Sequence, residues 1–214
     1  GNFFTGKLAS STDLSPFKLS FLRWSLAFLL LIPFTYKKII IDIAKYKKNI
    51  PYLMITSVLG VTIFNTFTYL SLQTSMVINS SIMTSITPLL VIFFSWLIFK
   101  TPTYPKQFFG IILSLIGVML IISKANYINL INLKFIKGDL WMLVAVFSWG
   151  LYSVLLKKID KTLSQLATLE VMIFFGLIFI FPFYIIETFD GSYLPKDSNE
   201  FLMISYVAIF ASIT

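Results

Sequence analysis

The chain has 214 residues, of which 57% are hydrophobic and only 12% are charged, whereas an average soluble domain has about 25% charged residues. Its mean hydropathy is +0.88, and it contains no cysteine and no histidine. This is the composition of a membrane protein, and it excludes disulfides, thiol or histidine catalysis and zinc sites built on these residues. The net charge of +8 fits basic membrane loops better than nucleic-acid binding, so no nucleic-acid partner is expected.

Charge-poor stretches that are long enough to cross a bilayer core of about 30 Å predict a series of membrane helices. No Asp, Glu, Lys or Arg occurs from residue 50 to residue 99, so this stretch must hold two spans. No removable signal peptide is recognisable, and both ends of the sequence are apolar, so we expect a fragment cut within a span at each end. The predicted spans are 1–10, 17–36, 52–72, 77–99, 107–123, 140–156, 166–186 and 201 onward.

Lysines are concentrated in every second predicted loop, which should therefore be cytoplasmic. They are Lys37, Lys38, Lys45, Lys47 and Lys48, then Lys100 and Lys106, then Lys157, Lys158 and Lys161. The opposite loops are less basic, since residues 71–81 are uncharged and the seventh connection is mainly acidic. The fifth connection departs from this pattern, with Lys124, Lys134 and Lys137 on the presumed outer side.

Two similar six-residue segments, LMITSV starting at Leu53 and LMISYV starting at Leu202, lie 149 residues apart. The same offset maps Leu14 onto Leu163, Ser15 onto Ser164, Pro33 onto Pro182 and Phe34 onto Phe183. This offset predicts a five-span repeat, with copies at 1–123 and 139–214 and a linker at 124–138. Because five is odd, the second copy enters from the other side of the membrane, as in the inverted repeats of secondary transporters. A complete second copy would need about 58 further residues.

Five segments, in this order, resemble EamA-type members of the drug/metabolite transporter superfamily. They are GNFFTGKLAS, LSPFKLSFLRWSLAFLLLIPF, YLSLQTSMVINSSIMTSITPLLVIFFSWLIF, QFFGIILSLIGVMLI and GDLWMLVAVFSWGLYSVLLKKIDKTLSQLATLE. The resemblance implies an all-α membrane protein, a helical bundle of two inverted five-helix repeats with about eight of its ten spans present. It also implies small-molecule transport, often metabolite export, in the bacterial cytoplasmic (inner) membrane. One departure is Lys100, because the family often has an acidic residue just after the fourth helix.

Polar side chains recur at helical spacing in two adjacent predicted spans. They are Thr62, Asn65, Thr66, Tyr69 and Gln73 in the third span, and Ser81, Thr84, Ser85 and Pro88 in the fourth. These stripes fit either ordinary interhelical hydrogen bonds, worth about 0.6 kcal/mol each, or the wall of a water-filled cavity. Pro88 leaves the carbonyl of Thr84 without a helical donor, which fits either a packing kink or a substrate contact.

The sixth span offers Ser148, Trp149 and Tyr152, and aligning Lys7 with Lys157 places Asn2 opposite Tyr152 in the inverted half. Tyr and Trp side chains there can enclose an amphipathic solute, although Trp149 is equally explained as a lipid- or helix-facing ring. The predicted substrate-binding residues are Asn2, Asn65, Thr66, Tyr69, Thr84, Pro88, Ser148, Trp149 and Tyr152.

Few ionisable side chains lie within the predicted spans, and among them are Lys7, Arg23 and Glu170. We expect Arg23 and Glu170 to lie in opposite leaflets, each reaching an interface, and not to pair. Small residues at 110, 114 and 117 lie on one face of the fifth span and predict close helix packing there.

The sequence thus predicts a transporter that moves a small polar or amphipathic metabolite, amino acid-like or drug-like, by alternating access between two halves. A non-transporting scaffold or receptor is the alternative, and it would bury the polar stripes dry between helices. An intramembrane enzyme would need a catalytic pair, which this sequence lacks. The expected partners are the substrate and the lipid bilayer, with no cofactor or metal, in a monomer or homodimer.

Overall fold

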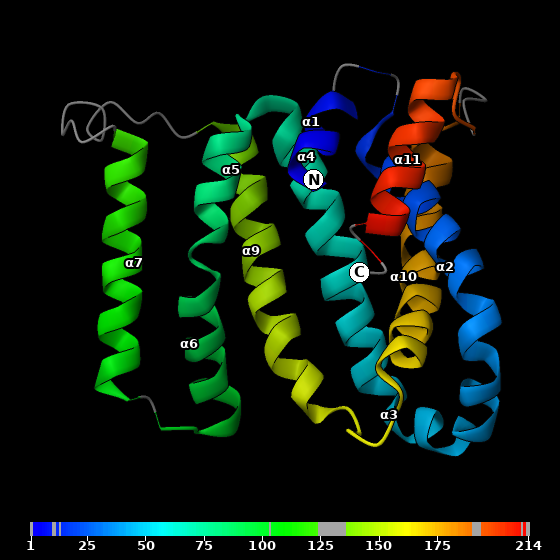
Figure 1. Ribbon diagram of the computed structural model, residues 1–214, viewed down its shortest axis with the longest axis horizontal. Helices are drawn as coiled ribbons and strands as arrows, with labels where there is room; N and C mark the ends of the chain where they lie inside the picture. Colours follow the sequence, from blue (N-terminus) through cyan, green and yellow to red (C-terminus); the bar gives the residue numbers. More distant parts are fainter. Residues whose placement is uncertain are drawn as a thin grey trace.

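A computed structural model describes residues 2–9, 12, 14–102, 104–123, 136–189, 194–210 and 212. Within these ranges every regular element is a helix, so the chain is an all-α membrane protein as predicted (Figure 1). Residues 124–135 of the predicted linker at 124–138 lie outside the described residues.

Helices occupy every predicted span. In chain order they are α1 (Asn2–Ala9), α2 (Pro16–Ile41), α3 (Ile43–Thr56), the π-helix η1 (Ser57–Ile63), α4 (Phe64–Thr74), α5 (Val77–Thr84), α6 (Thr87–Phe99), α7 (Pro105–Ser123), α9 (Lys137–Leu155), the 3₁₀-helix η2 (Leu156–Lys158), α10 (Gln165–Glu187) and α11 (Ser198–Phe210). Among the described residues, five continuous or nearly continuous segments are long and apolar enough to cross a membrane. They are Pro16–Ile41, Ile43–Thr74, Val77–Phe99, Lys137–Lys158 and Gln165–Glu187.

The fourth predicted span is broken into α5 and α6 where Pro88 predicts an interruption. Ser85 and Ile86 form a tight turn, in which their N–H groups donate to the carbonyls of Ile82 and Met83 at 2.9 and 3.1 Å. Pro88 then lies in the first turn of α6, where its missing N–H and fixed φ cost nothing. The break therefore comes from the local sequence.

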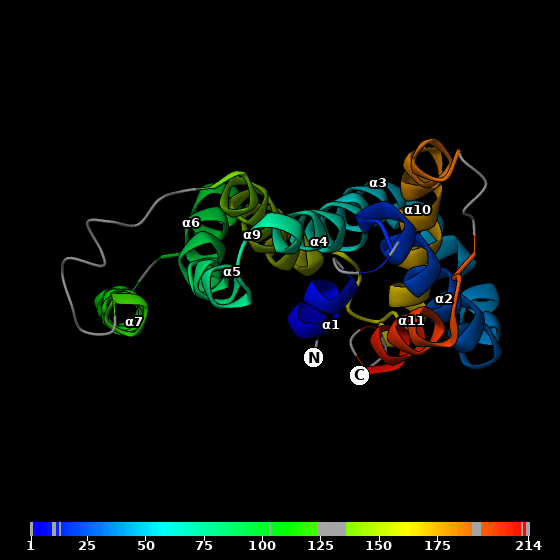
Figure 2. The same ribbon diagram turned by 90° about the horizontal axis from the view of Figure 1, so that it is seen from above.

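The helices form a curved row, from α7 at one edge through α5, α6, α9 and α4 to α2, α10 and α11 at the other (Figures 1 and 2). The most closely packed pairs are α2 with α10 and α4 with α9. Within a bilayer, helices associate through close packing and hydrogen bonds, because lipid tails are as apolar as the side chains. Gly176 of α10 fits this rule, since a Cβ there would collide with Val61 of η1.

The small residues of α7 do not make the predicted helix contact within the described part of the chain. No described atom outside the helix itself lies within 4 Å of a Cβ placed at Gly110 or Gly117, and the side chain of Ser114 lies outside the described residues. α7 makes only a small contact with α5, and most of its described residues are exposed.

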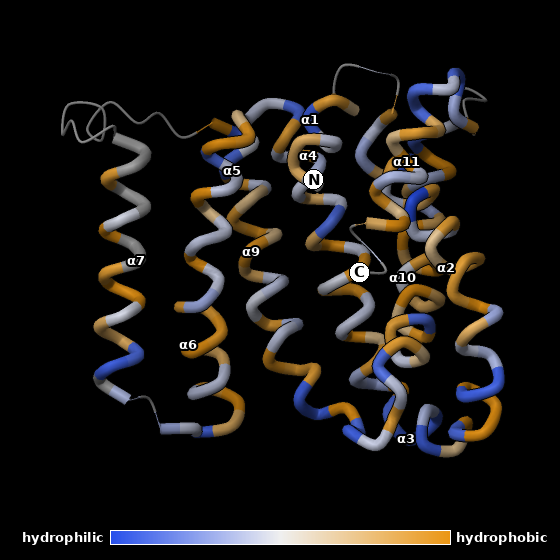
Figure 3. The backbone as a smooth tube through the Cα atoms, in the orientation of Figure 1, coloured by the Kyte–Doolittle hydropathy of each residue, from blue (hydrophilic) through white to orange (hydrophobic). Residues whose placement is uncertain are grey.

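The turns between α2 and α3, between α6 and α7 and between α9 and α10 lie at one end of the bundle, the lower end in Figure 1. These turns and the adjoining helix ends carry the lysines of the predicted cytoplasmic loops, and hydrophilic residues gather there in Figure 3. α2 begins at Pro16 and α10 at Gln165, and these helices cross the bundle in opposite directions. Opposite directions are what the predicted inverted repeat requires, and the repeat itself stays a prediction.

Candidate functional site

The third membrane span is a π-helix in its middle, at η1. π-helical geometry turns backbone carbonyls away from their usual partners and occurs often at functional sites. The Nδ2 of Asn65 donates to the carbonyl of Gly60 at 2.8 Å, and the hydroxyl of Ser148 on α9 donates to the carbonyl of Leu59. The hydroxyl of Thr62 donates to the carbonyl of Gly176 at 3.3 Å. The π-helix is therefore held by side chains and backbone from neighbouring helices.

The Arg23 guanidinium of α2 lies beside this π-helix and is only 1% exposed. Its Nη1 donates to Oδ1 of Asn65 at 2.8 Å and to the hydroxyl of Tyr69 at 2.6 Å. Its Nε donates to the hydroxyl of Ser212 at 2.7 Å, and its Cζ lies 4.6 Å from the centroid of the Trp24 ring. A buried charge is costly unless it is hydrogen-bonded, so these polar side chains fix the position of the guanidinium.

Aromatic rings line the other side of the π-helix. The ring of Tyr152 on α9 lies close against Gly60, because a Cβ at Gly60 would stand 2.7 Å from two carbons of the ring. The Trp149 ring lies 4.8 Å from that of Tyr152 and 4.4 Å from that of Phe64, centroid to centroid. Within the described residues, the Tyr152 hydroxyl has no hydrogen-bond partner, and the residue is partly exposed.

We call this group the central cluster, and it contains Arg23, Gly60, Asn65, Tyr69, Ser148, Trp149 and Tyr152. It combines a buried positive charge, an amide, hydroxyls and aromatic faces around one π-helix. Such a mixture can bind a small solute that has both polar and apolar parts. No group of three His, Cys, Asp or Glu side chains that could hold a metal ion occurs in the part of the chain that the structure describes.

Five of the nine predicted substrate-binding residues belong to the central cluster, namely Asn65, Tyr69, Ser148, Trp149 and Tyr152. Thr66 is fully buried, and its hydroxyl donates to that of Ser20 at 3.1 Å, which ties α4 to α2.

The remaining three predicted residues are not brought to this cluster by described contacts. The hydroxyl of Thr84 donates to the carbonyl of Ser81 on the same helix. Pro88 is exposed on α6, which packs on α9. The side chain of Asn2 lies outside the described residues.

Arg23 and Glu170 do not reach an interface, so that expectation is wrong. Both are buried, at 1% and 2% exposure, and they do not pair with each other, because both carboxylate oxygens of Glu170 have no hydrogen-bond partner among the described residues. The central position of Arg23 was not predicted, because its partners Asn65 and Tyr69 lie 42 and 46 residues away in the sequence. In the sequence, only the presence of Arg23 within a predicted span indicated a functional position.

This chain is similar to one known protein family and to several individual proteins. The EamA-like transporter family matches residues 1–123 and 136–214. The chain is similar to an uncharacterized transporter of Archaeoglobus fulgidus, with 29% identity over 203 residues, which are 93% of this chain and 68% of the relative. It is also similar to the uncharacterized transporter YetK of Bacillus subtilis, with 26% identity over 169 residues, 78% of this chain and 51% of the relative.

A third relative, an uncharacterized transporter of Clostridium kluyveri, is 24% identical over 208 residues, which are 95% of this chain and 66% of the relative. The chain thus spans about half to two thirds of the length of these relatives. No solved structure matches it significantly.

Proposed function

Because the chain belongs to the EamA-like transporter family, we propose that it is part of a secondary transporter that exports a small polar or amphipathic metabolite, amino acid-like or drug-like. The transporter resides in the bacterial inner membrane as a monomer or homodimer. Its two halves alternate access to a site that includes the central cluster, as inverted-repeat transporters do around a site near the bilayer midplane.

The observation that carries this proposal is the chemistry gathered at the π-helix. A network that only holds helices together satisfies its polar groups, as Asn65 and Ser148 do here. Tyr152, by contrast, is a partly exposed residue whose hydroxyl has no partner among the described residues. It stands beside a π-helix, whose geometry is frequent at functional sites. This hydroxyl is therefore available to a ligand.

The test compares metabolites inside and outside cells that overexpress the full-length protein or its variants. Tyr152→Phe removes only the free hydroxyl, so we expect the excess of exported metabolite to fall at least about tenfold, as when a buried polar contact to a ligand is lost. Thermal stability should stay unchanged. Tyr206→Phe is the matched control, because Tyr206 is 44% exposed on α11 and its ring lies tilted against that of Phe210, 5.2 Å away between centroids.

Export by Tyr152→Phe at the level of the wild type would remove this hydroxyl from the site. A scaffold or receptor of the same fold predicts a different result, in which the wild type changes no metabolite on either side of the membrane.

A further inference from the structure

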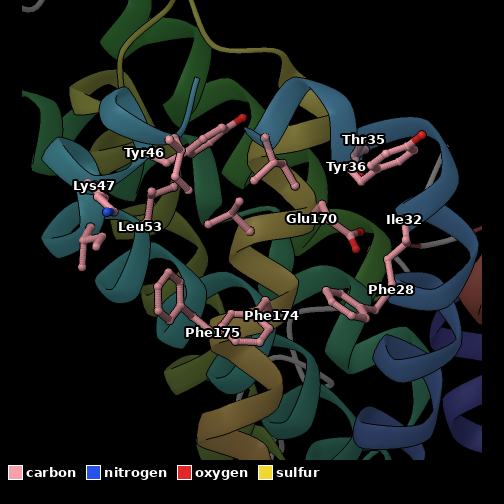
Figure 4. A pocket seen from close by; sticks show the side chains of 14 residues that line it. Phe28, Ile32, Thr35, Tyr36, Tyr46, Lys47, Leu53, Glu170, Phe174 and Phe175 are labelled. Carbon is pink, nitrogen blue, oxygen red and sulfur yellow. The ribbon is translucent and has the colours of Figure 1, made fainter. Parts of the chain in front are cut away.

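A groove of about 320 Å³ lies between α2, α3 and α10, in the half of the bundle next to the turn that joins α2 to α3. Its wall includes Phe28 and Ile32 of α2, Leu53 of α3, and Phe174 and Phe175 of α10 (Figure 4). Ile32 and Phe174 are 36% and 48% exposed, so the groove opens on the outer surface of the described helices. None of these residues belongs to the central cluster, so the groove is a separate feature of the fold.

The wall of this groove presents only apolar surface. The hydroxyl of Thr35 donates to the carbonyl of Leu31 at 3.0 Å, and both carboxylate oxygens of Glu170 are covered by other atoms. A polar group placed here would lose its hydration without gaining hydrogen bonds. The groove therefore suits a hydrocarbon chain.

Lysines stand where the groove meets the basic end of the bundle. Lys47 lines the groove from α3 and is exposed. Tyr36 lines it from α2, and the Nζ of Lys37 lies 5.9 Å from the centroid of the Tyr36 ring. In Figure 4, Lys47 lies on the α3 side and Tyr36 on the α2 side. We call Lys37 and Lys47 the mouth lysines, because they place two positive charges beside the open end of an apolar groove.

The acidic side chains at this end of the bundle act on other lysines. Asp42 forms a salt bridge with Lys45 at 2.8 Å. The charge of Asp160, in the turn between α9 and α10, acts on Lys45 and Lys48. Among the described residues, neither mouth lysine forms an ion pair. Both are therefore available to an anion from outside the chain.

We propose that this groove binds an anionic phospholipid of the cytoplasmic leaflet, with one acyl chain against Phe174 and Phe175 and the phosphate beside the mouth lysines. Basic pockets between membrane helices on the cytoplasmic side bind anionic headgroups in this way. An acyl chain meets similar surroundings in the bilayer and in the groove, so the charge of the headgroup decides which lipid binds. The site does not depend on the proposed export by the central cluster.

Native mass spectrometry of the delipidated full-length protein, titrated in detergent with palmitoyl-oleoyl phosphatidylglycerol, tests this proposal. We expect a saturable first site that binds this lipid at least about tenfold more tightly than phosphatidylcholine with the same chains, which has no net charge. Lys37→Gln/Lys47→Gln removes both mouth lysines and should weaken the first site about 25-fold, because one lysine near an anionic headgroup contributes about fivefold. Lys100→Gln/Lys106→Gln is the matched control, an equal change of charge at the turn between α6 and α7, and should bind like the wild type.

Two further measurements test the position of the acyl chain. Phe174→Ala removes a ring from the groove wall and should weaken binding about threefold or more, because the contacts of that ring with the chain are lost. Phe181→Ala, at a residue of the same helix that is 50% exposed and outside the groove, should bind like the wild type. Glycerol 1-phosphate carries the phosphate without the chains and should not displace the lipid.

Each of four results would overturn the proposal: absence of a saturable first site, equal affinity for the two lipids, or wild-type affinity of either the mouth-lysine variant or Phe174→Ala. Displacement of the lipid by glycerol 1-phosphate would also overturn it, because the headgroup alone would then account for binding. Export is not measured in these experiments, so their outcome is independent of the proposed transport.

Discussion

Tyr69→Phe tests whether the central cluster is organised around the charge of Arg23. The substitution keeps the ring, which is 2% exposed, and removes the oxygen that lies 2.6 Å from Nη1 of Arg23. Hydrogen bonds to charged groups contribute about 1.5–3 kcal/mol, and the loss is greatest when the remaining donor is buried. Arg23 is 1% exposed, so we expect the free energy of unfolding to fall by about 1.5–3 kcal/mol.

Thermal unfolding of the purified protein in detergent measures this effect. At about 2–4 °C per kcal/mol for a protein of this size, the midpoint should fall by about 3–12 °C. The control is Tyr46→Phe, another buried tyrosine, whose hydroxyl lies 3.5 Å from that of Thr168. So long a contact is worth less than about 1 kcal/mol. Equal shifts for the two variants would refute a special role for the Arg23 contact.

Three further substitutions test close contacts of the fold. Gly138→Ala places a Cβ 2.6 Å from the backbone oxygen of residue 71 and should lower the free energy of unfolding by about 1–3 kcal/mol. Gly110→Ala, with no described atom within 4 Å of its Cβ, should leave the free energy of unfolding unchanged. Equal costs for the two variants would contradict the close packing at Gly138. Gly60→Ala pushes on the Tyr152 ring and should lower export in the metabolite assay far more than Gly110→Ala does; normal export would argue against the site. Asp139→Ala removes the acceptor of the backbone N–H of residue 136 at 3.1 Å and of the Ser75 hydroxyl at 2.6 Å. It should cost at least about 1–2 kcal/mol on the same unfolding scale, whereas an unchanged midpoint would show that these two contacts are dispensable.

The helices of the fold were predictable because membrane spans need long apolar stretches, which are a local property of the sequence. The break before α6 was likewise predictable from Pro88. The ends of the helices were less predictable. For example, α2 continues to Ile41 rather than ending at residue 36, because lysines near a helix end can extend toward the interface while the backbone stays helical.

The π-helix had no signal in the sequence, since its carbonyls are held by side chains that fold onto it. Asn65 and Ser148 supply these bonds, and Ser148 lies 89 residues from its partner Leu59. The position of Arg23 was predicted wrongly for the same reason, since its hydrogen-bond partners also lie far away in the sequence. A hydropathy pattern gives the depth of a residue in the membrane and leaves open which neighbours meet it. The polar stripe on α4 still identified Asn65 and Tyr69, because helical spacing places them on one face.

The central claim is that the central cluster belongs to a pathway that opens to water, and the reactivity of a single introduced thiol tests it most directly. The 214 residues contain no cysteine, so Ser148→Cys adds the only thiol in this part of the protein. Ala145→Cys is the control on the same helix, at a fully buried position packed among apolar side chains. With a membrane-impermeant methanethiosulfonate added to oriented vesicles, our account predicts that Ser148→Cys reacts from at least one side and Ala145→Cys from neither. If Ser148→Cys is as unreactive as Ala145→Cys from both sides, the cluster is a dry helix contact and the account is contradicted.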